Sequence, residues 1–246
     1  MPGIRIAVVT DTFPAISETF IAAEVRALQR LGAPVDVYAH ARAQQPDPDV
    51  EIPATYLAGR ASRPPLRALP DVRHQRRWRR EEQPLTLREL APLLRARPTH
   101  LHAHFGAGAA LSALRVARLT GATFSVTFHG YDIFLTPMNL AEKVREAAFV
   151  TSGSDYTVNA LRERQPQAAS KIHRIVMGVD TEAWKRTSPD REPGLVVAVG
   201  RLVEKKGFVH LKRAAELLPD GMRVVIAGDG PLRDELESDR VELLGA

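Results

Sequence analysis

The chain has 246 residues, of which 44% are hydrophobic and 26% are charged, a composition that allows one large or two small globular domains. It contains no cysteine, which excludes disulfides, thiolate chemistry and cysteine-ligated metals. No apolar run reaches the roughly 20 residues that span a bilayer, and the N-terminus predicts a strand rather than a signal peptide. The net charge of +5 favours anionic partners. We therefore expect a cytoplasmic protein with peripheral contact at the inner membrane.

The first predicted elements form a β-α-β unit. Ile4–Thr10 predicts a strand, and Ser17 is a good N-cap for the helix that follows, with Glu18 in its first turn. The alternating residues Pro34–His40 predict the second strand. The unit lacks a G-x-G-x-x-G turn, so the dinucleotide fingerprint is absent.

The segment Arg42–Pro98 is rich in proline and arginine and predicts little regular structure. Within it, Arg60–Arg80 carries eight arginines against one acid, Asp71, with Trp78 among them. A solvated surface segment is the first interpretation. Contact with an anionic membrane is the second, because tryptophan and arginine suit an interface. Nucleic-acid binding is not expected, since no recognised motif surrounds the cluster.

The next predicted strand, Thr99–Gly106, carries three histidines. His100, His102 and His104 alternate, so all three should lie on one face of the sheet. Imidazoles are good metal ligands. However, no carboxylate is expected beside them, and parallel strands usually have both faces covered. We therefore expect no metal site.

A helix over Ala107–Thr120 leads to a strand at Ala122–Gly130, which ends in a second group of candidate residues. His129 comes where this strand should end, so its side chain can project into the crevice at the carboxyl ends of the strands. Tyr131 and Asp132 follow it. A histidine with an ordinary structural role at a strand end is the alternative.

The rest of the first domain alternates helices and strands, and Ser154 is expected to cap the second of these helices. The predicted elements are a helix at Leu140–Ala148, a strand at Phe149–Ser154, a helix at Asp155–Arg164, a strand at Lys171–Met177 and a linker at Lys185–Pro193.

The second domain begins with a buried strand in Leu195–Phe208. Gly200, Arg201 and Lys206 form the loop after this strand, and a helix is predicted to open at Gly207. The N-terminus of a helix attracts anions, and two added cations suit a diphosphate. The alternative is a solvated loop whose charges only favour solubility.

Three further elements complete this domain: a strand at Met222–Ala227, a helix at Pro231–Glu237 and a strand at Arg240–Leu244. Three strands are fewer than a doubly wound sheet normally has. We therefore expect exposed apolar faces on Val196–Val199 and Val224–Ala227, through which the chain could associate with itself.

The two glycine-containing motifs of this domain, GRLVEKKG and IAGDGPLRDEL, resemble the donor half of the family 4 retaining glycosyltransferases. That resemblance implies the GT-B fold, an α/β architecture of two facing Rossmann-like domains. It also implies that Arg201 and Lys206, beside Gly200, bind the diphosphate of a nucleotide sugar. The turn of Gly228, Asp229 and Gly230 is the second motif of the family.

The first domain resembles exopolysaccharide and colanic-acid members of the same family in FPAISETF, HAHFG, FHGYDIF and KIHRIVMGVDTEAW. The last of these resembles the family's hinge. The resemblance implies that His129, supported by Asp132, acts at the donor sugar or reacting centre. It places four residues on the acceptor side: Ser17, Glu18, His104 and Gly106.

Together these predictions describe a two-domain glycosyltransferase, with an acceptor-side domain at residues 1–185 and a partial donor domain at residues 186–246. The co-substrate would be a nucleotide-diphosphate sugar, without a cofactor or metal, and the acceptor a glycan or a lipid-linked molecule. The family's later E-x-x-x-x-x-x-x-E segment is not present, so we expect a truncated chain without activity of its own. A nucleotide-sugar epimerase or phosphorylase, or a non-catalytic half of a split enzyme, are the alternatives.

Overall fold

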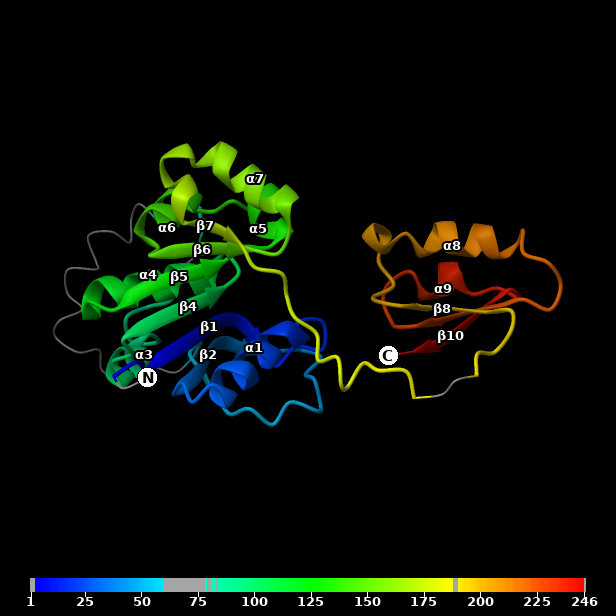
Figure 1. Ribbon diagram of the computed structural model, residues 1–246, viewed down its shortest axis with the longest axis horizontal. Coiled ribbons are helices and arrows are strands. Elements are labelled where there is room, and N and C mark those ends of the chain that lie inside the picture. Colours follow the sequence, from blue (N-terminus) through cyan, green and yellow to red (C-terminus); the bar gives the residue numbers. More distant parts are fainter. Residues whose placement is uncertain (1–2, 60–77, 79–80, 83, 188–189, 246) are drawn as a thin grey trace. The chain divides into compact units, whose positions relative to one another are not determined.

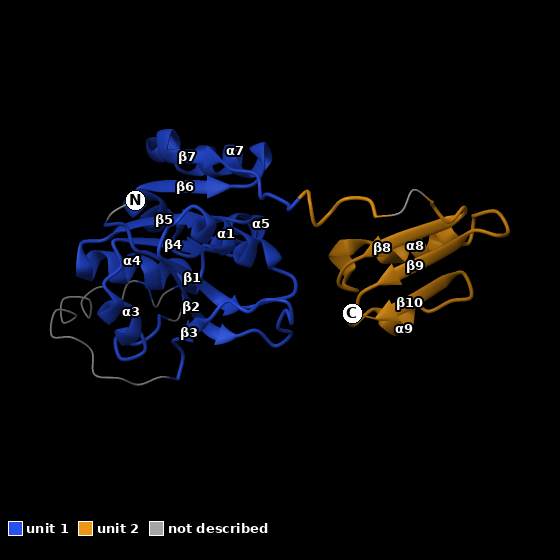
Figure 2. Cartoon of the chain, turned by 60° about the horizontal axis from the view of Figure 1, so that its bottom comes forward, with its two compact units in different colours: residues 1–180 blue, residues 181–246 orange. Residues whose placement is uncertain are grey.

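The structure is a computed structural model that describes residues 3–59, 78, 81–82, 84–187 and 190–245. The chain forms two compact units, residues 1–180 and 181–246, which Figure 2 colours separately. The first unit therefore ends at Asp180, whereas the sequence placed the boundary after residue 185.

Unit 1 is built on a parallel sheet of seven strands in the order β3-β2-β1-β4-β5-β6-β7 (Figure 1). The strands are β1 Ile6–Phe13, β2 Val35–Arg42, β3 Ala54–Tyr56, β4 His100–His104, β5 Thr123–Thr127, β6 Phe149–Ser152 and β7 Ile172–Arg174. The helices are α1 Thr19–Arg30, α3 Ala91–Ala96, α4 Gly108–Thr120, α5 Gly130–Phe134, α6 Leu140–Glu146 and α7 Asp155–Arg164, followed by the 3₁₀ helix η2 Pro166–Lys171. This confirms the α/β class.

The two faces of this sheet have separate cores. Successive side chains of a strand point to opposite faces, and in β1 Ala7 and Val9 join the core on the side of α3, α4, α6 and α7. Val8 instead packs with Ile21 and Val25 of α1. The large apolar core therefore lies beneath α4, and α1 covers β1 and β2 on the other face.

Strand β4 follows the same alternation. Leu101 and Ala103 belong to the core beneath α4. The histidines of β4 consequently face the α1 side, together with Ser125 of β5. This part of the α1 side is polar rather than apolar, and that difference positions the site described below.

Two elements within Arg42–Pro98 were not predicted, β3 and α3. These elements and the residues beside them contribute to the main core, because Leu57 after β3, Leu90 before α3 and Leu93 within α3 are fully buried. The interpretation of this segment as a solvated region is therefore wrong for these parts. It failed because the segment's apolar residues are few and lie between polar ones.

Trp78 is also buried, and its Nε1 donates a hydrogen bond to Glu142 Oε2 at 3.0 Å. The guanidinium groups of Arg115 and Arg118 lie over its ring. A membrane-contacting role for this tryptophan is therefore contradicted.

The eight arginines of Arg60–Arg80 lie outside the described residues, as does their proposed lipid contact. Within the described part of the chain, no helix combines the length and apolarity needed to cross a membrane.

Of the two predicted helix caps, Ser154 is confirmed and Ser17 is wrong. Ser154 caps α7 as expected, since its hydroxyl accepts a hydrogen bond from the Thr157 N–H at 3.2 Å. Ser17 does not cap α1. The helix begins at Thr19 with Glu18 in the N-cap position, because a turn brings the Glu18 N–H to the carbonyl of Ala15.

Unit 2 is a smaller parallel sheet in the order β10-β9-β8. Its elements are β8 Leu195–Val199, the 3₁₀ helix η3 Glu204–Lys206, α8 Phe208–Ala215, β9 Arg223–Ala227, α9 Arg233–Leu236 and β10 Val241–Gly245. Val197 and Val199 of the edge strand β8 are 59% and 76% exposed, as expected. The expectation for β9 is wrong, because this central strand is covered and Val224 and Ile226 are buried.

Candidate functional site

The carboxyl ends of β4 and β5 bring several predicted residues of unit 1 together. The rings of His104 and His129 stack with their centroids 6.3 Å apart. Phe20 of α1 lies 5.8 Å from the His104 ring and 5.0 Å from the His129 ring, and Phe105 lies 4.6 Å from the latter. Strand order explains the cluster, since β4 and β5 are neighbours in the sheet and α1 packs beside them.

His129 lies between β5 and α5, with an extended backbone and a half-buried ring. Burial, together with the nearby His104, lowers its pKa to about 4, while Glu24 opposes both effects. The imidazole is therefore neutral at pH 7. A neutral ring can donate or accept a hydrogen bond to a sugar hydroxyl.

Asp132 is buried and acts on His129 through the backbone. Its Oδ2 accepts a hydrogen bond from the His129 N–H at 2.9 Å. Burial raises the pKa of this carboxyl, whereas the N–H groups of His129 and Gly106 lower it. We therefore interpret Asp132 as a positioning residue rather than a catalytic one.

Position 106 requires glycine because the ring of Phe128 approaches its backbone closely. A Cβ at this position would lie 2.2 Å from the ring of Phe128. The carbonyl of Gly106 accepts a hydrogen bond from the buried Nζ of Lys143 at 2.6 Å, and the same Nζ lies 2.7 Å from Glu82 Oε1. No local pattern indicated a role for Lys143, since a lysine within a short amphipathic helix normally lies at the surface.

The other two acceptor-side candidates lie just before α1. Ser17 is exposed and Glu18 is half-buried. Two residues of α1 itself, Phe20 and Glu24, contact His104 of β4. The sequence prediction missed both. Phe20 and Glu24 are four residues apart, so they share one face of the predicted helix, and this spacing was the signal that could have found them.

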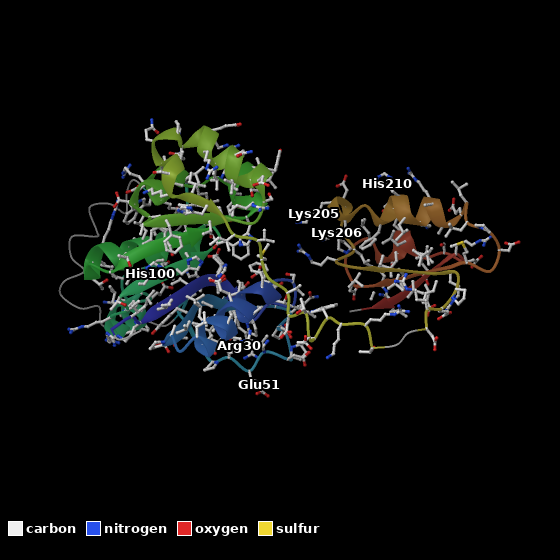
Figure 3. The ribbon with its side chains drawn as sticks, viewed as in Figure 1. Arg30, Glu51, His100, Lys205, Lys206 and His210 are labelled. Carbon is white, nitrogen blue, oxygen red and sulfur yellow. The ribbon has the colours of Figure 1, made fainter. Side chains whose placement is uncertain are left out.

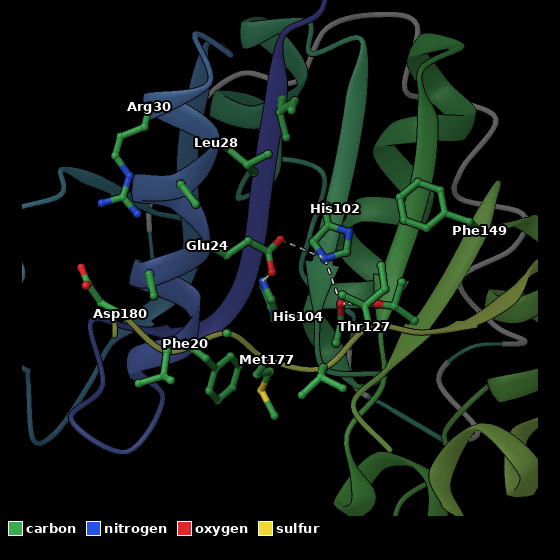
Figure 4. A pocket seen from close by; sticks show the side chains of 18 of the residues that line it. Phe20, Glu24, Leu28, Arg30, His102, His104, Thr127, Phe149, Met177 and Asp180 are labelled. Atoms are coloured by element: carbon green, nitrogen blue, oxygen red, sulfur yellow. Dashed lines mark hydrogen bonds and ion pairs between the residues drawn. The ribbon is translucent and has the colours of Figure 1, made fainter. Parts of the chain in front are cut away.

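A pocket of about 530 Å³ lies on the α1 side of the sheet (Figure 4). His100, His102 and His104 all line it, which confirms that they share one face. Glu24 of α1 also lines it: its Oε1 lies 3.6 Å from His102 Nε2 and its Oε2 lies 3.5 Å from His104 Nε2. The expectation that no carboxylate joins these histidines is therefore wrong.

Hydroxyl groups of β5 hold the histidines of this pocket. Ser125 Oγ lies 2.7 Å from His102 Nδ1, and Thr127 Oγ1 lies 3.0 Å from its Nε2. Burial, together with the nearby His104, lowers the pKa of His102 to about 3, while Glu24 opposes this shift. Burial by itself would raise the pKa of Glu24, but the hydrogen bond from His104 and the surrounding histidines lower it. The pocket therefore contains a carboxylate beside a neutral imidazole.

In unit 2, the two predicted glycine motifs meet at the carboxyl ends of β8 and β9. The Leu202 N–H donates to the carbonyl of Asp229 at 2.9 Å, and the Leu232 N–H donates to the carbonyl of Leu202 at 3.1 Å. Gly200 and Gly228 are in van der Waals contact, close enough that a side chain on Gly228 would collide with the Gly200 carbonyl. Gly230 approaches Leu202 in the same way. The two loops therefore form one continuous surface.

The cations of this surface are exposed. Arg201 and Lys206 project from the loop between β8 and α8, and neither forms an ion pair with any residue that the structure describes. Lys205 and Lys206 come just before α8 (Figure 3), whose N-cap is Gly207 in the left-handed conformation. Helical N–H groups and exposed cations at one loop form a site suited to an anion.

A model of Glycosyltransferase Family 4 matches residues 17–183 of the chain. The chain belongs to this family. The match covers most of unit 1, including the clustered strand ends that carry His104 and His129. It bears out the resemblance to family 4.

Two curated relatives are glycosyltransferases. The chain is 28% identical over 155 residues to a putative teichuronic acid biosynthesis glycosyltransferase, TuaC of Bacillus subtilis, covering 56% of this chain and 40% of the relative. It is 29% identical over 199 residues to the alpha-D-kanosaminyltransferase of Streptomyces kanamyceticus, covering 69% and 50%. The chain thus spans half or less of the length of these relatives.

Solved structures support the GT-B fold. Anabaena Alr3699/HepE in complex with UDP-glucose matches with a TM-score of 0.66 and 17% identity, over 98% of this chain and 68% of that one. A glycosyltransferase from Rickettsia africae matches with a TM-score of 0.63 and 11% identity, over 99% and 68%. At these identities the comparison establishes the fold, as expected from the sequence.

Proposed function

We propose that this glycosyltransferase-family chain transfers a sugar from a nucleotide-diphosphate donor to a glycan or lipid-linked acceptor, with retention of configuration. Unit 2 would hold the donor and unit 1 the acceptor. The joined loops of unit 2, which present Arg201 and Lys206 beside the start of α8, carry this proposal. The names of TuaC and of the HepE complex support a glycan product and a UDP-sugar donor, respectively.

The proposed role of the two cations is to stabilise the leaving diphosphate. Negative charge grows on this group as the bond to the sugar breaks, so interactions with it are stronger in the transition state than in the ground state. Arg201 can contact two phosphate oxygens at once, and Lys206 supplies a compact charge. We propose that they replace a divalent ion in this step.

The proposed role of His129 is to orient the sugar. Its neutral ring projects from a strand end, and Asp132 fixes its backbone from behind. His104 and Gly106 shape the neighbouring strand end, where the acceptor would lie. Ser17 and Glu18 flank that position at the start of α1.

Replacing Arg201 with alanine is expected to weaken UDP binding by roughly 1.5–3 kcal/mol, the range for hydrogen bonds to charged groups. Calorimetric titration of UDP into the chain measures this loss. Lys205→Ala is the matched control, because Lys205 is an exposed cation of the same loop outside the family motif. Equal affinities of the Arg201 variant and the unchanged chain would refute the diphosphate site.

Replacing His129 with alanine is expected to lower kcat by at least roughly fivefold, since one lost hydrogen bond in the transition state is worth about 1 kcal/mol or more. UDP affinity should stay unchanged, because the diphosphate cations are in unit 2. Turnover is measured on the protein that the gene encodes, with His173→Ala as an exposed histidine control. An unchanged kcat would leave His129 a structural residue.

The same assay, read by product analysis, separates the reaction classes. A retaining transferase needs an acceptor and gives a product with the anomeric configuration of the donor. Donor conversion without any acceptor would instead indicate an epimerase. UDP binding without turnover under either condition would indicate a non-catalytic binding module.

A further inference from the structure

Three potential metal ligands converge on the α1 side of unit 1. Glu24 comes from α1, and His102 and His104 come from β4. The ligand atoms of the three side chains all lie within 4.8 Å of one another. Figure 4 shows Glu24 pointing from its helix toward both rings, with dashed lines to each.

The spacing of these atoms fits a tetrahedral ion. Zinc binds histidine nitrogen and carboxylate oxygen at about 2.0–2.2 Å, which places neighbouring ligands of a tetrahedron about 3.3 Å apart. The two distances from Glu24 are 3.6 Å to His102 Nε2 and 3.5 Å to His104 Nε2. Small side-chain movements would therefore complete the coordination.

His104 is the second observation that indicates a ligand. Its side chain is only 1% exposed, yet among the residues that the structure describes its Nδ1 has no hydrogen-bond partner, and its Nε2 has only the 3.5 Å contact with Glu24. A buried polar group without a partner is costly. A metal ion between His104 and Glu24 would satisfy the nitrogen that faces the carboxylate.

His102 is already oriented as a metal ligand requires. Metal-bound histidines usually donate the other ring N–H to an oxygen, and His102 Nδ1 lies 2.7 Å from Ser125 Oγ. Its Nε2 is then the coordinating atom. Thr127, which contacts this nitrogen, has an alternative partner in Thr151 Oγ1 at 2.7 Å.

We propose that Glu24, His102 and His104 bind one divalent transition-metal ion, with Zn²⁺ as the best fit. Two imidazoles and one carboxylate suit zinc better than magnesium, which prefers oxygen ligands. The fourth position would face the pocket and hold water. The ion would join α1 to β4, so its binding should stabilise unit 1. This inference does not depend on the proposed sugar transfer.

The test is a titration of the chain with Co²⁺, a zinc substitute whose visible absorption reports its coordination. The absence of cysteine leaves histidine and carboxylate as the ligands that dominate the spectrum. We expect one Co²⁺ per chain, displaced by Zn²⁺ and not by Mg²⁺. Absence of saturable one-to-one binding would overturn the proposal.

Glu24→Gln is the decisive variant, because it keeps the shape of a half-exposed side chain and removes the charged ligand. We expect Co²⁺ to bind this variant at least about tenfold more weakly, a loss typical of damaged metal sites. Zn²⁺ should raise the Tm of the unchanged chain more than that of the variant. His173→Gln, an exposed histidine of β7, is the control and should bind Co²⁺ as the unchanged chain does. Equal binding by Glu24→Gln would refute the site.

Discussion

Replacing Lys143 with methionine is expected to lower the free energy of unfolding of unit 1 by about 3–5 kcal/mol, the usual cost of breaking a buried ion pair. The Lys143 side chain is 0% exposed. Its Nζ lies 2.7 Å from Glu82 Oε1 and donates to the carbonyl groups of Gly106 and Met138. Methionine fills the same space but leaves the carboxylate and these carbonyl groups without their donor. Urea unfolding measures the loss.

The control for this variant lies on the same helix. Arg145→Met removes an exposed cation that pairs with Glu146 at 3.2 Å, and such surface pairs are worth at most about 1 kcal/mol. Adding Glu82→Gln to the Lys143 variant should restore part of the loss, because the unpaired carboxylate is then gone. A Lys143 variant as stable as the Arg145 variant would contradict the prediction.

The effect should extend to the candidate site. Lys143 also donates to the carbonyl of Ala107 at 3.2 Å, so it fixes the turn that follows β4. Burial lowers the pKa of Lys143 and raises that of Glu82, while their mutual attraction opposes both shifts. Without this cation, amide hydrogens around Gly106 should exchange faster than they do in the unchanged chain. Exchange in α7, which is far along the chain, should change less.

Replacing Gly228 with alanine is expected to destabilise unit 2 by roughly 2–6 kcal/mol, the sum of a backbone strain and an overpacking cost. Gly228 has a φ of +151°, and a Cβ there would lie 1.9 Å from the carbonyl oxygen of Gly200. Relief requires the ends of β8 and β9 to separate. Hydrogen exchange of the amides in these two strands measures the result.

Gly221→Ala is the matched control within the same unit. Its φ is +86°, but nothing lies within 4 Å of the added Cβ. It therefore carries strain without the collision, and it should accelerate exchange less than Gly228→Ala does. Equal exchange in both variants would mean that the approach of Gly200 and Gly228 has no energetic consequence. UDP binding should fall with the Gly228 variant, since the joined loops would separate.

The sequence by itself determined the elements whose signals are local. Alternation and short apolar runs located the strands of both units, except β3, to within a few residues, and Ser154 correctly marked the start of α7. The glycine motifs placed Arg201 and Lys206 between a strand and a helix, where the structure has them. These signals depend on residues close in the sequence, so they can be read without the fold.

The candidate site of unit 1 was predicted in part. Period-two spacing placed the histidines of β4 on one face, and the position of His129 after a strand was correct. At the start of α1, Phe20 and Glu24 reach His104, while the acceptor-side role of Ser17 and Glu18 stays a prediction. The local pattern gives the face of a helix but not the partner that the face meets.

Tertiary structure alone decided three further features: Glu24 beside the histidines of β4, the burial of Trp78, and the ion pair of Lys143 with Glu82. The first and third join residues more than 60 positions apart. The burial of Trp78 depends on Arg115 and Arg118 of α4, 37 and 40 positions away, and on Glu142 of α6, 64 positions away. Strand order explains the contact of Glu24 with the histidines, since β1 lies next to β4 and thereby brings α1 to the face of the sheet that carries them. Residue type sets what a side chain can do, but the packing of distant elements sets its burial and its partners.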